Sequence, residues 1–317
     1  MRIVALVAVA AIATAAFAAT PVYFEVPRGG HPHDVAADPA PGGPVYYTAQ
    51  HTGKLGILDP RSGRVEEIAL GPRSAPHGVV VGPDRAAWVT DSGRNAIIRV
   101  DPATRALREW PLPADTGYAN LNTAAFDRHG RLWFTGQSGY YGRVDPARGE
   151  VRVWPAPQGR GPYGMTATPA GDIWYCSLAG NHIARVDIDT GAATVVAPPT
   201  ADQGARRLWS DSRGRLWVSY WNTGHVGRYD PATESWREWK LPGASPRAYS
   251  VWVDPDDIVW LTEWSANAVV RFDPATEAFT SYPSNRLGAA VRQMLGRKGE
   301  AWGAESGTDR LVMIPAR

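Results

Sequence analysis

The chain has 317 residues, of which 44% are hydrophobic and 20% are charged. This composition can bury a large core and excludes an intrinsically disordered chain. The 33 basic and 31 acidic side chains give a formal net charge of only +2. They form no basic stripe that could follow a phosphate backbone, so we expect no nucleic-acid partner.

The N-terminus has the pattern of a secretory signal peptide over residues 1–18. Met1-Arg2 is followed by an Ala/Val/Ile-rich run that ends in Ala16-Phe17-Ala18. The run is shorter than the ~20 residues that span a bilayer, although an uncleaved anchor is the alternative. We expect cleavage after Ala18 and one mature domain, residues 19–317. This domain should be a periplasmic or secreted monomer without membrane insertion.

An aromatic anchor recurs along the rest of the chain and defines a repeat. Successive anchors lie 41 to 45 residues apart. Fixed periods of this size are typical of repeat architectures in which each unit is one supersecondary element. There are seven anchors, and hence seven units: Tyr46, Trp88, Trp133, Trp174, Trp217, Trp260 and Trp302.

Each unit contains four short segments in which apolar and polar residues alternate. In the second unit these are Gly78–Val81, Ala86–Thr90, Ala96–Val100 and Leu107–Trp110, separated by Gly, Pro, Asn and Asp. Period-two segments with such boundaries predict antiparallel strands. The sequence therefore predicts an all-β fold, a seven-bladed β-propeller of four-stranded antiparallel blades.

The two ends of the chain are predicted to share the last blade. After Trp302 there is room for only two more strands, and residues 22–27 resemble the outer strands of other units. We expect this N-terminal strand to complete the seventh blade, because pairing the first strand with the last removes free sheet edges.

One register, about eleven residues before each anchor, is polar or capable of hydrogen bonding in all seven units. Uniform polarity at a packed strand position would be costly, so we expect these side chains to face a wet channel mouth that holds a polar small molecule. The alternative is that they only hydrogen bond to one another and to ordered water. The candidate catalytic residues are His33, His77, Tyr163 and Tyr249, because imidazole and phenol transfer protons. The candidate ligand-binding residues are Asn122, Arg206 and Arg292.

A second register, three residues after the anchor, contributes carboxylates at the same mouth. Asp91, Glu263 and Glu305 are the candidate ligands for a divalent metal such as Mg²⁺ or Ca²⁺. We expect no nucleotide cofactor and no haem.

The recurring Pro-His/Tyr-Gly, Trp-x-Thr-Glu/Asp and Ile-x-Arg-Val-Asp patterns resemble those of the virginiamycin B lyase (streptogramin lyase) family. The most similar segment is residues 260–267, Trp-Leu-Thr-Glu-Trp-Ser-Ala-Asn. The resemblance implies a seven-bladed propeller. It also implies an elimination that opens a cyclic depsipeptide, with a histidine base and a Mg²⁺ ion held by glutamates.

The sequence departs from the family pattern at the residues that the resemblance implies for catalysis. Tyr249 replaces the histidine of the sixth blade, residues 290–292 read Ala-Val-Arg in place of Glu-Pro-His, and Ser306 replaces the last glutamate. We therefore do not expect efficient streptogramin cleavage. The expected function is a metal-assisted lyase or lactonase on a cyclic ester or other polar small molecule. The alternative is a non-catalytic propeller that senses a ligand or binds a protein.

Overall fold

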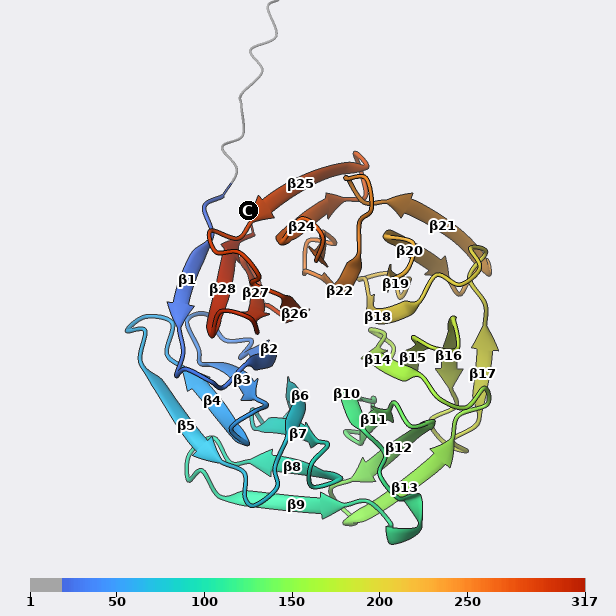
Figure 1. Cartoon of the computed structure of the whole chain (residues 1–317). Coiled ribbons are helices and arrows are strands. Elements are labelled where there is room, and N and C mark those ends of the chain that lie inside the picture. Colours follow the sequence, from blue (N-terminus) through green and yellow to red (C-terminus); the bar gives the residue numbers. More distant parts are fainter. Residues whose placement is uncertain (1–18, 317) are drawn as a thin grey trace, which may run out of the picture.

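The computed structural model describes residues 19–316. They form seven four-stranded antiparallel sheets arranged around a central channel, which confirms the predicted all-β propeller (Figure 1). The predicted signal peptide, residues 1–18, lies outside the described residues. Within residues 19–316, no helix is long and apolar enough to span a membrane.

The first four blades follow the chain, each from its innermost to its outermost strand. Blade one is β2 (Pro32–Ala37), β3 (Val45–Ala49), β4 (Lys54–Leu58) and β5 (Val65–Ala69). Blade two is β6 (Pro76–Val81), β7 (Ala87–Asp91), β8 (Ala96–Val100) and β9 (Leu107–Pro111), and the short 3-10 helix η1 (Ala114–Thr116) follows it. Blade three is β10 (Leu121–Phe126), β11 (Leu132–Gly136), β12 (Tyr140–Asp145) and β13 (Glu150–Pro155). Blade four is β14 (Pro162–Ala167), β15 (Ile173–Ser177), β16 (His182–Val186) and β17 (Ala193–Val196).

The last three blades complete the ring. Blade five is β18 (Ala205–Ser210), β19 (Leu216–Tyr220), β20 (His225–Asp230) and β21 (Ser235–Lys240). Blade six is β22 (Ala248–Val253), β23 (Val259–Glu263), β24 (Ala268–Asp273) and β25 (Ala278–Pro283). Blade seven is β26 (Val291–Met294), β27 (Glu300–Glu305), β28 (Arg310–Pro315) and β1 (Val22–Glu25).

The N-terminal strand closes the ring as predicted. β1 pairs antiparallel with β28, with Phe24 opposite Leu311. The Phe24 ring lies 5.2 Å from the ring of Trp302, the anchor of the same blade. The outer edge of the seventh blade is therefore formed by the opposite end of the chain, as Figure 1 shows.

The aromatic anchors form the core of the blades. Trp133, Trp217, Trp260 and Trp302 are among the largest fully buried side chains. A buried indole N–H needs an acceptor, and Trp133, for example, donates to Asp127 at 2.8 Å. These tryptophans are core residues and not a surface for stacking ligands.

Every innermost strand carries the same irregularity at its start. The pairing between the first and second strands shifts register within the first few residues in all seven blades. Such bulges re-aim side chains. In five of the blades a hydroxyl group holds the bulge. Thr48, for example, accepts from the backbone N–H of Asp34 at 3.0 Å and donates to the His77 carbonyl of the next blade at 2.8 Å. Ser219 links Arg207 to Tyr249 in the same way.

Candidate functional site

The seven side chains of the polar register lie together in the channel, at the start of the innermost strands. Five of its seven side chains are buried, and Arg206 and Arg292 are partly exposed. The expectation of a wet mouth therefore holds only in part. Several of these side chains hydrogen bond to one another, which is consistent with their burial.

His33 belongs to a buried chain of three charged or titratable groups. Its Nδ1 lies 2.8 Å from Oδ1 of Asp34. Arg207, from the fifth blade, donates to the same carboxylate at 3.0 Å and also donates to the Thr123 hydroxyl. Asp34 thus accepts from two donors and fixes the orientation of the His33 ring, leaving Nε2 free to exchange a proton.

His77 lies directly beside His33, with the ring centroids 3.8 Å apart. Its Nε2 is 3.3 Å from Nδ2 of the Asn122 side chain. Oδ1 of the same side chain accepts a hydrogen bond from the Thr123 hydroxyl at 2.9 Å. Because the amide nitrogen is a donor, Nε2 of His77 is the acceptor and its proton lies on Nδ1, which has no partner among the described residues. His77 is therefore less available as a base than His33.

Two tyrosines face the histidines from other blades. The hydroxyls of Tyr163 and Tyr249 lie 2.9 Å apart, and Arg206 donates to the Tyr163 oxygen at 2.9 Å. Since a guanidinium can only donate, the proton of Tyr163 is free to point at Tyr249. The Tyr163 ring is also 6.3 Å from the ring of His77, so the imidazoles and phenols form one continuous cluster.

An aromatic wall extends this cluster toward solvent. Trp264 stacks on Tyr249 at 4.8 Å, and Trp221 lies edge-on to Trp264 at 5.4 Å. The Arg206 guanidinium lies 3.7 Å from the Tyr249 ring centroid, and that of Arg292 lies 5.5 Å from the Trp264 ring centroid. Both guanidinium groups are held on ring faces by cation–π contacts.

Burial and neighbouring charges lower the pKa values of both histidines. Burial, together with the positive charge of Arg292, holds the pKa of His33 well below its ordinary value. Burial and the neighbouring His33 also lower the pKa of His77. Both imidazoles are thus neutral at pH 7, as a proton acceptor must be.

The pKa values of the two phenols shift in opposite directions. Burial, together with Tyr249, raises the pKa of Tyr163. Burial alone would also raise the pKa of Tyr249, but the charges of Arg206, Arg207 and Arg292 outweigh it and hold that pKa below its ordinary value. Tyr249 is therefore the more acidic member of the pair.

The three carboxylates expected to bind metal lie at this end of the second strands, but each already accepts hydrogen bonds or forms an ion pair with the protein. Asp91 accepts the backbone N–H groups of Ala75 and Arg94. Glu263 accepts those of Arg247 and Ser265, and Glu305 pairs with Arg310 at 2.6 Å. Their role as metal ligands stays a prediction, and these contacts give it no support.

A different group has donor atoms close enough to share an ion. Within residues 19–316, the only three His, Cys, Asp or Glu side chains whose donor atoms all lie within 4.8 Å of one another are His33, Asp34 and His77. This group does not fit the Mg²⁺ that the family resemblance implies, since Mg²⁺ and Ca²⁺ prefer oxygen ligands. Its one carboxylate is already ion-paired with Arg207. The proton transfers of the proposed reaction are therefore assigned to side chains and not to a metal ion.

Three residues of the cluster do not belong to the register that the sequence singled out. Asp34, Thr123 and Arg207 each follow a register residue directly. Strict strand alternation would turn them away from the channel, whereas the bulge turns them into it. The two adjacent arginines 206 and 207, at the start of a predicted inner strand, were a signal that could have revealed this.

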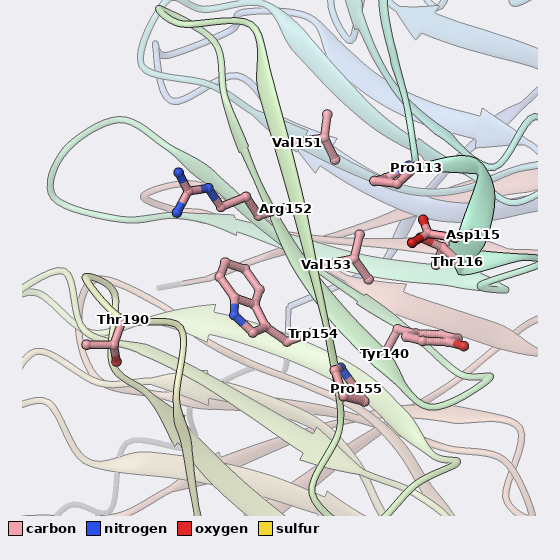
Figure 2. Close-up of a pocket in the computed structure, with 10 residues that line it drawn as sticks. All are labelled: Pro113, Asp115, Thr116, Tyr140, Val151, Arg152, Val153, Trp154, Pro155 and Thr190. Atoms are coloured by element: carbon pink, nitrogen blue, oxygen red, sulfur yellow. The ribbon is translucent and has the colours of Figure 1, made fainter.

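Several surface grooves lie outside the channel, and one of them is shown in Figure 2. It has a volume of about 400 Å³ and lies between η1, β12 and β13, and Thr190 in the turn after β16 (Figure 2). Its lining includes Asp115, Arg152 and Trp154, but no cluster of groups that exchange protons. The channel cluster is therefore the better candidate site.

The fold and the cluster define a class: a seven-bladed propeller whose buried histidines and tyrosines meet at one end of the central channel. The sequence comparison agrees. The model of the virginiamycin B lyase family matches residues 4–244. The chain belongs to this family.

Solved structures share the fold at low sequence identity. A streptogramin B lyase superposes with a TM-score of 0.87 at 21% identity, covering 96% of this chain and 100% of that one. Virginiamycin B lyase from Staphylococcus aureus gives a TM-score of 0.85 at 19% identity, covering 94% and 99% of the two chains. Among curated proteins, a gluconolactonase from Zymomonas mobilis subsp. mobilis is 38% identical over 78 residues. That match spans only 22% of the gluconolactonase and 23% of this chain.

Proposed function

We propose that the channel cluster is an active site that performs acid–base catalysis on a small polar substrate. The reaction is a carbon–oxygen lyase or lactonase reaction. The observation that carries the proposal is that an oriented, neutral imidazole, His33 on Asp34, shares one cluster with a hydrogen-bonded phenol pair. His77 links them, because its ring lies 3.8 Å from the His33 ring and 6.3 Å from the Tyr163 ring. β2 and β14, which carry His33 and Tyr163, lie on opposite sides of the channel (Figure 1).

The same residues serve either reaction. In an elimination, Nε2 of His33 removes the proton α to a carbonyl, the C=C bond forms as the C–O bond breaks, and the leaving oxygen takes a proton from Tyr249. In lactone hydrolysis, His33 takes a proton from the attacking water and Tyr249 again protonates the leaving oxygen. Asp34 stabilises the imidazolium in both cases. Arg206 and Tyr163 orient the proton of the acid.

Two comparisons support the choice of reaction classes. Family membership favours the elimination, and the partial match to a gluconolactonase favours lactone hydrolysis. Tyr249, Arg292 and Ser306 occupy the positions that the resemblance assigns to the family's own catalytic groups. Streptogramins are accordingly not the proposed substrates.

Kinetics on a set of lactones and cyclic esters test the proposal. His33→Gln and Tyr249→Phe should each lower kcat about 10²- to 10⁴-fold, the usual contribution of one positioned acid or base. His129→Gln, which changes an exposed imidazole in a turn, is the matched control and should retain full activity. Full activity of His33→Gln would remove His33 from the mechanism.

Binding without turnover by the wild-type protein is the outcome expected of the alternative, a ligand-sensing propeller. Isothermal titration calorimetry of the same compounds would detect it.

We further propose that residues 1–18 are an export signal, which N-terminal sequencing of the mature protein tests. Cleavage after Ala18 is the expected result, and a retained N-terminus would indicate an anchor.

A further inference from the structure

Two guanidinium groups reach the channel site without an acidic partner. Within the described part of the chain, neither Arg206 nor Arg292 forms an ion pair, and the buried Nε atom of each has no hydrogen-bond partner there. The neighbouring Arg207 also has a buried Nε without a partner among the described residues, but it differs in forming an ion pair with Asp34 at 3.0 Å. The chain compensates the deeper charge and leaves the two outer charges uncompensated.

The contacts that these two guanidinium groups do make carry no formal negative charge. Arg206 lies over the rings of Tyr163, Trp221 and Tyr249 at 4.6, 4.8 and 3.7 Å from the ring centroids. Arg292 lies over Trp264. Partial burial of an unpaired guanidinium costs stability, and the aromatic faces offset only part of that cost. A bound anion is the group that would complete the compensation.

The composition of the cluster also indicates that the ligand is negatively charged. The cluster contains three guanidinium groups, Arg206, Arg207 and Arg292, and one carboxylate, Asp34, while both histidines are neutral at pH 7. The carboxylates at the ends of the second strands, Asp91, Glu263 and Glu305, are engaged by local donors. A partly enclosed site with excess positive charge concentrates anions. The planar fork of a guanidinium matches an oxyanion with two oxygens and holds it by two parallel hydrogen bonds.

We propose that the substrate of this site carries a free carboxylate, which Arg292 and Arg206 bind. The inference rests on the proposed function, since the acid–base reaction requires a carbon acid or an acyl group, which an inorganic oxyanion lacks. The guanidinium groups supply the fixed positive charge beside His33, and the carboxylate orients the reacting carbon toward that base. The substrate class is a small polar carboxylic acid, such as a sugar acid or hydroxy acid.

Thermal shift and calorimetry with matched pairs of ligands test this inference, with a chelator present throughout. The probes are glucuronate, galacturonate, gluconate, malate and mandelate, the methyl ester of each, and inorganic phosphate. At least one acid should raise the melting temperature by mass action, while its neutral ester should not. Arg292→Gln should weaken that acid about 10- to 100-fold, the worth of hydrogen bonds to a charged group.

Two controls separate a binding role from a structural one. Arg213→Gln, at an exposed arginine in the turn before β19, should leave binding unchanged. Arg292→Gln should melt no lower than the wild type without ligand, because it removes an uncompensated charge. Measurement in His33→Gln separates the two proposals, since the acids should still bind there while turnover is lost.

Three outcomes would overturn the inference. These are equal binding of acids and esters, binding of phosphate but of no carboxylate, and no binding of any acid in the set. Retained carboxylate binding with no turnover of any acid would refute only the proposed reaction.

Discussion

Removing the charge of Asp34 should destabilise the propeller more than most single substitutions. Asp34 and Arg207 are both about 2% exposed or less, and their ion pair joins blades one and five across the channel. Asp34→Asn keeps the shape of the side chain and an acceptor for Nδ1 of His33, so it removes little besides the charge. A guanidinium cannot lose its proton, and Arg207 would be left buried without a counter-ion.

Breaking a buried ion pair in this way costs about 3–5 kcal/mol. At about 2 °C per kcal/mol for a large domain, Asp34→Asn should lower the melting temperature by roughly 6–10 °C. The reverse change, Arg207→Met, should cost less. Burial raises the pKa of Asp34 although Arg207 opposes this, so the carboxyl can take up a proton once Arg207 is removed.

A double-mutant cycle by urea unfolding measures the coupling. Asp34→Asn combined with Arg207→Met should be more stable than Asp34→Asn alone, because neither buried charge remains. Additive effects of the two substitutions, within about 0.5 kcal/mol, would refute the reasoning. They would show that water or a neighbouring group compensates Arg207 in the absence of Asp34.

Two further predictions concern pH and ring closure. Because the pKa values of His33 and His77 are lowered in the folded state, the unfolded chain binds more protons below about pH 6.5. The free energy of unfolding should therefore rise between about pH 5 and 7, by up to about 1.4 kcal/mol per pH unit for each histidine. Urea titrations of the double His33→Gln/His77→Gln variant should show a flatter profile than those of His129→Gln, and equal slopes would contradict the pKa assignment. Deletion of residues 19–28 should lower the melting temperature sharply, since it exposes the edge of β28, and Phe24→Ala should lose part of the about 3–5 kcal/mol typical of a buried phenylalanine. An unchanged melting curve for the deletion would argue against closure by β1.

The architecture could be predicted from the sequence because it depends on local patterns that repeat. The spacing of the anchors gave seven blades, and the similarity of residues 22–27 to outer strands gave the closure. The site could be predicted only in part. Each register residue follows from position within a unit, but the pairing of Asp34 with Arg207 joins residues 173 positions apart and depends on closure of the whole ring.

The carboxylates show a second limit of reasoning from register alone. Asp91, Glu263 and Glu305 were placed at the correct end of their strands, yet a strand position does not state which donors lie nearby. Glu263 shows the reason: it is followed by a turn whose backbone N–H groups, including that of Ser265, point back at its carboxylate. Local donors of this kind compete with any ion for the same oxygens.

The bulge explains how one repeat can provide both a rigid channel and the residues of the proposed site. In blades one, three and five it turns two consecutive polar residues of the inner strand into the channel, one in an inner layer and one in an outer layer. In the fifth blade the inner layer receives Arg207, which pairs with Asp34, while the outer layer receives Arg206, which has no acidic partner. Arg207, which is paired, helps to hold Asp34 and His33 in place, and Arg206, which is unpaired, keeps the charge that the proposed carboxylate would bind. Stability and recognition are thereby assigned to adjacent residues, and substitutions at Arg207 and Arg206 should have opposite effects on the melting temperature of the ligand-free protein.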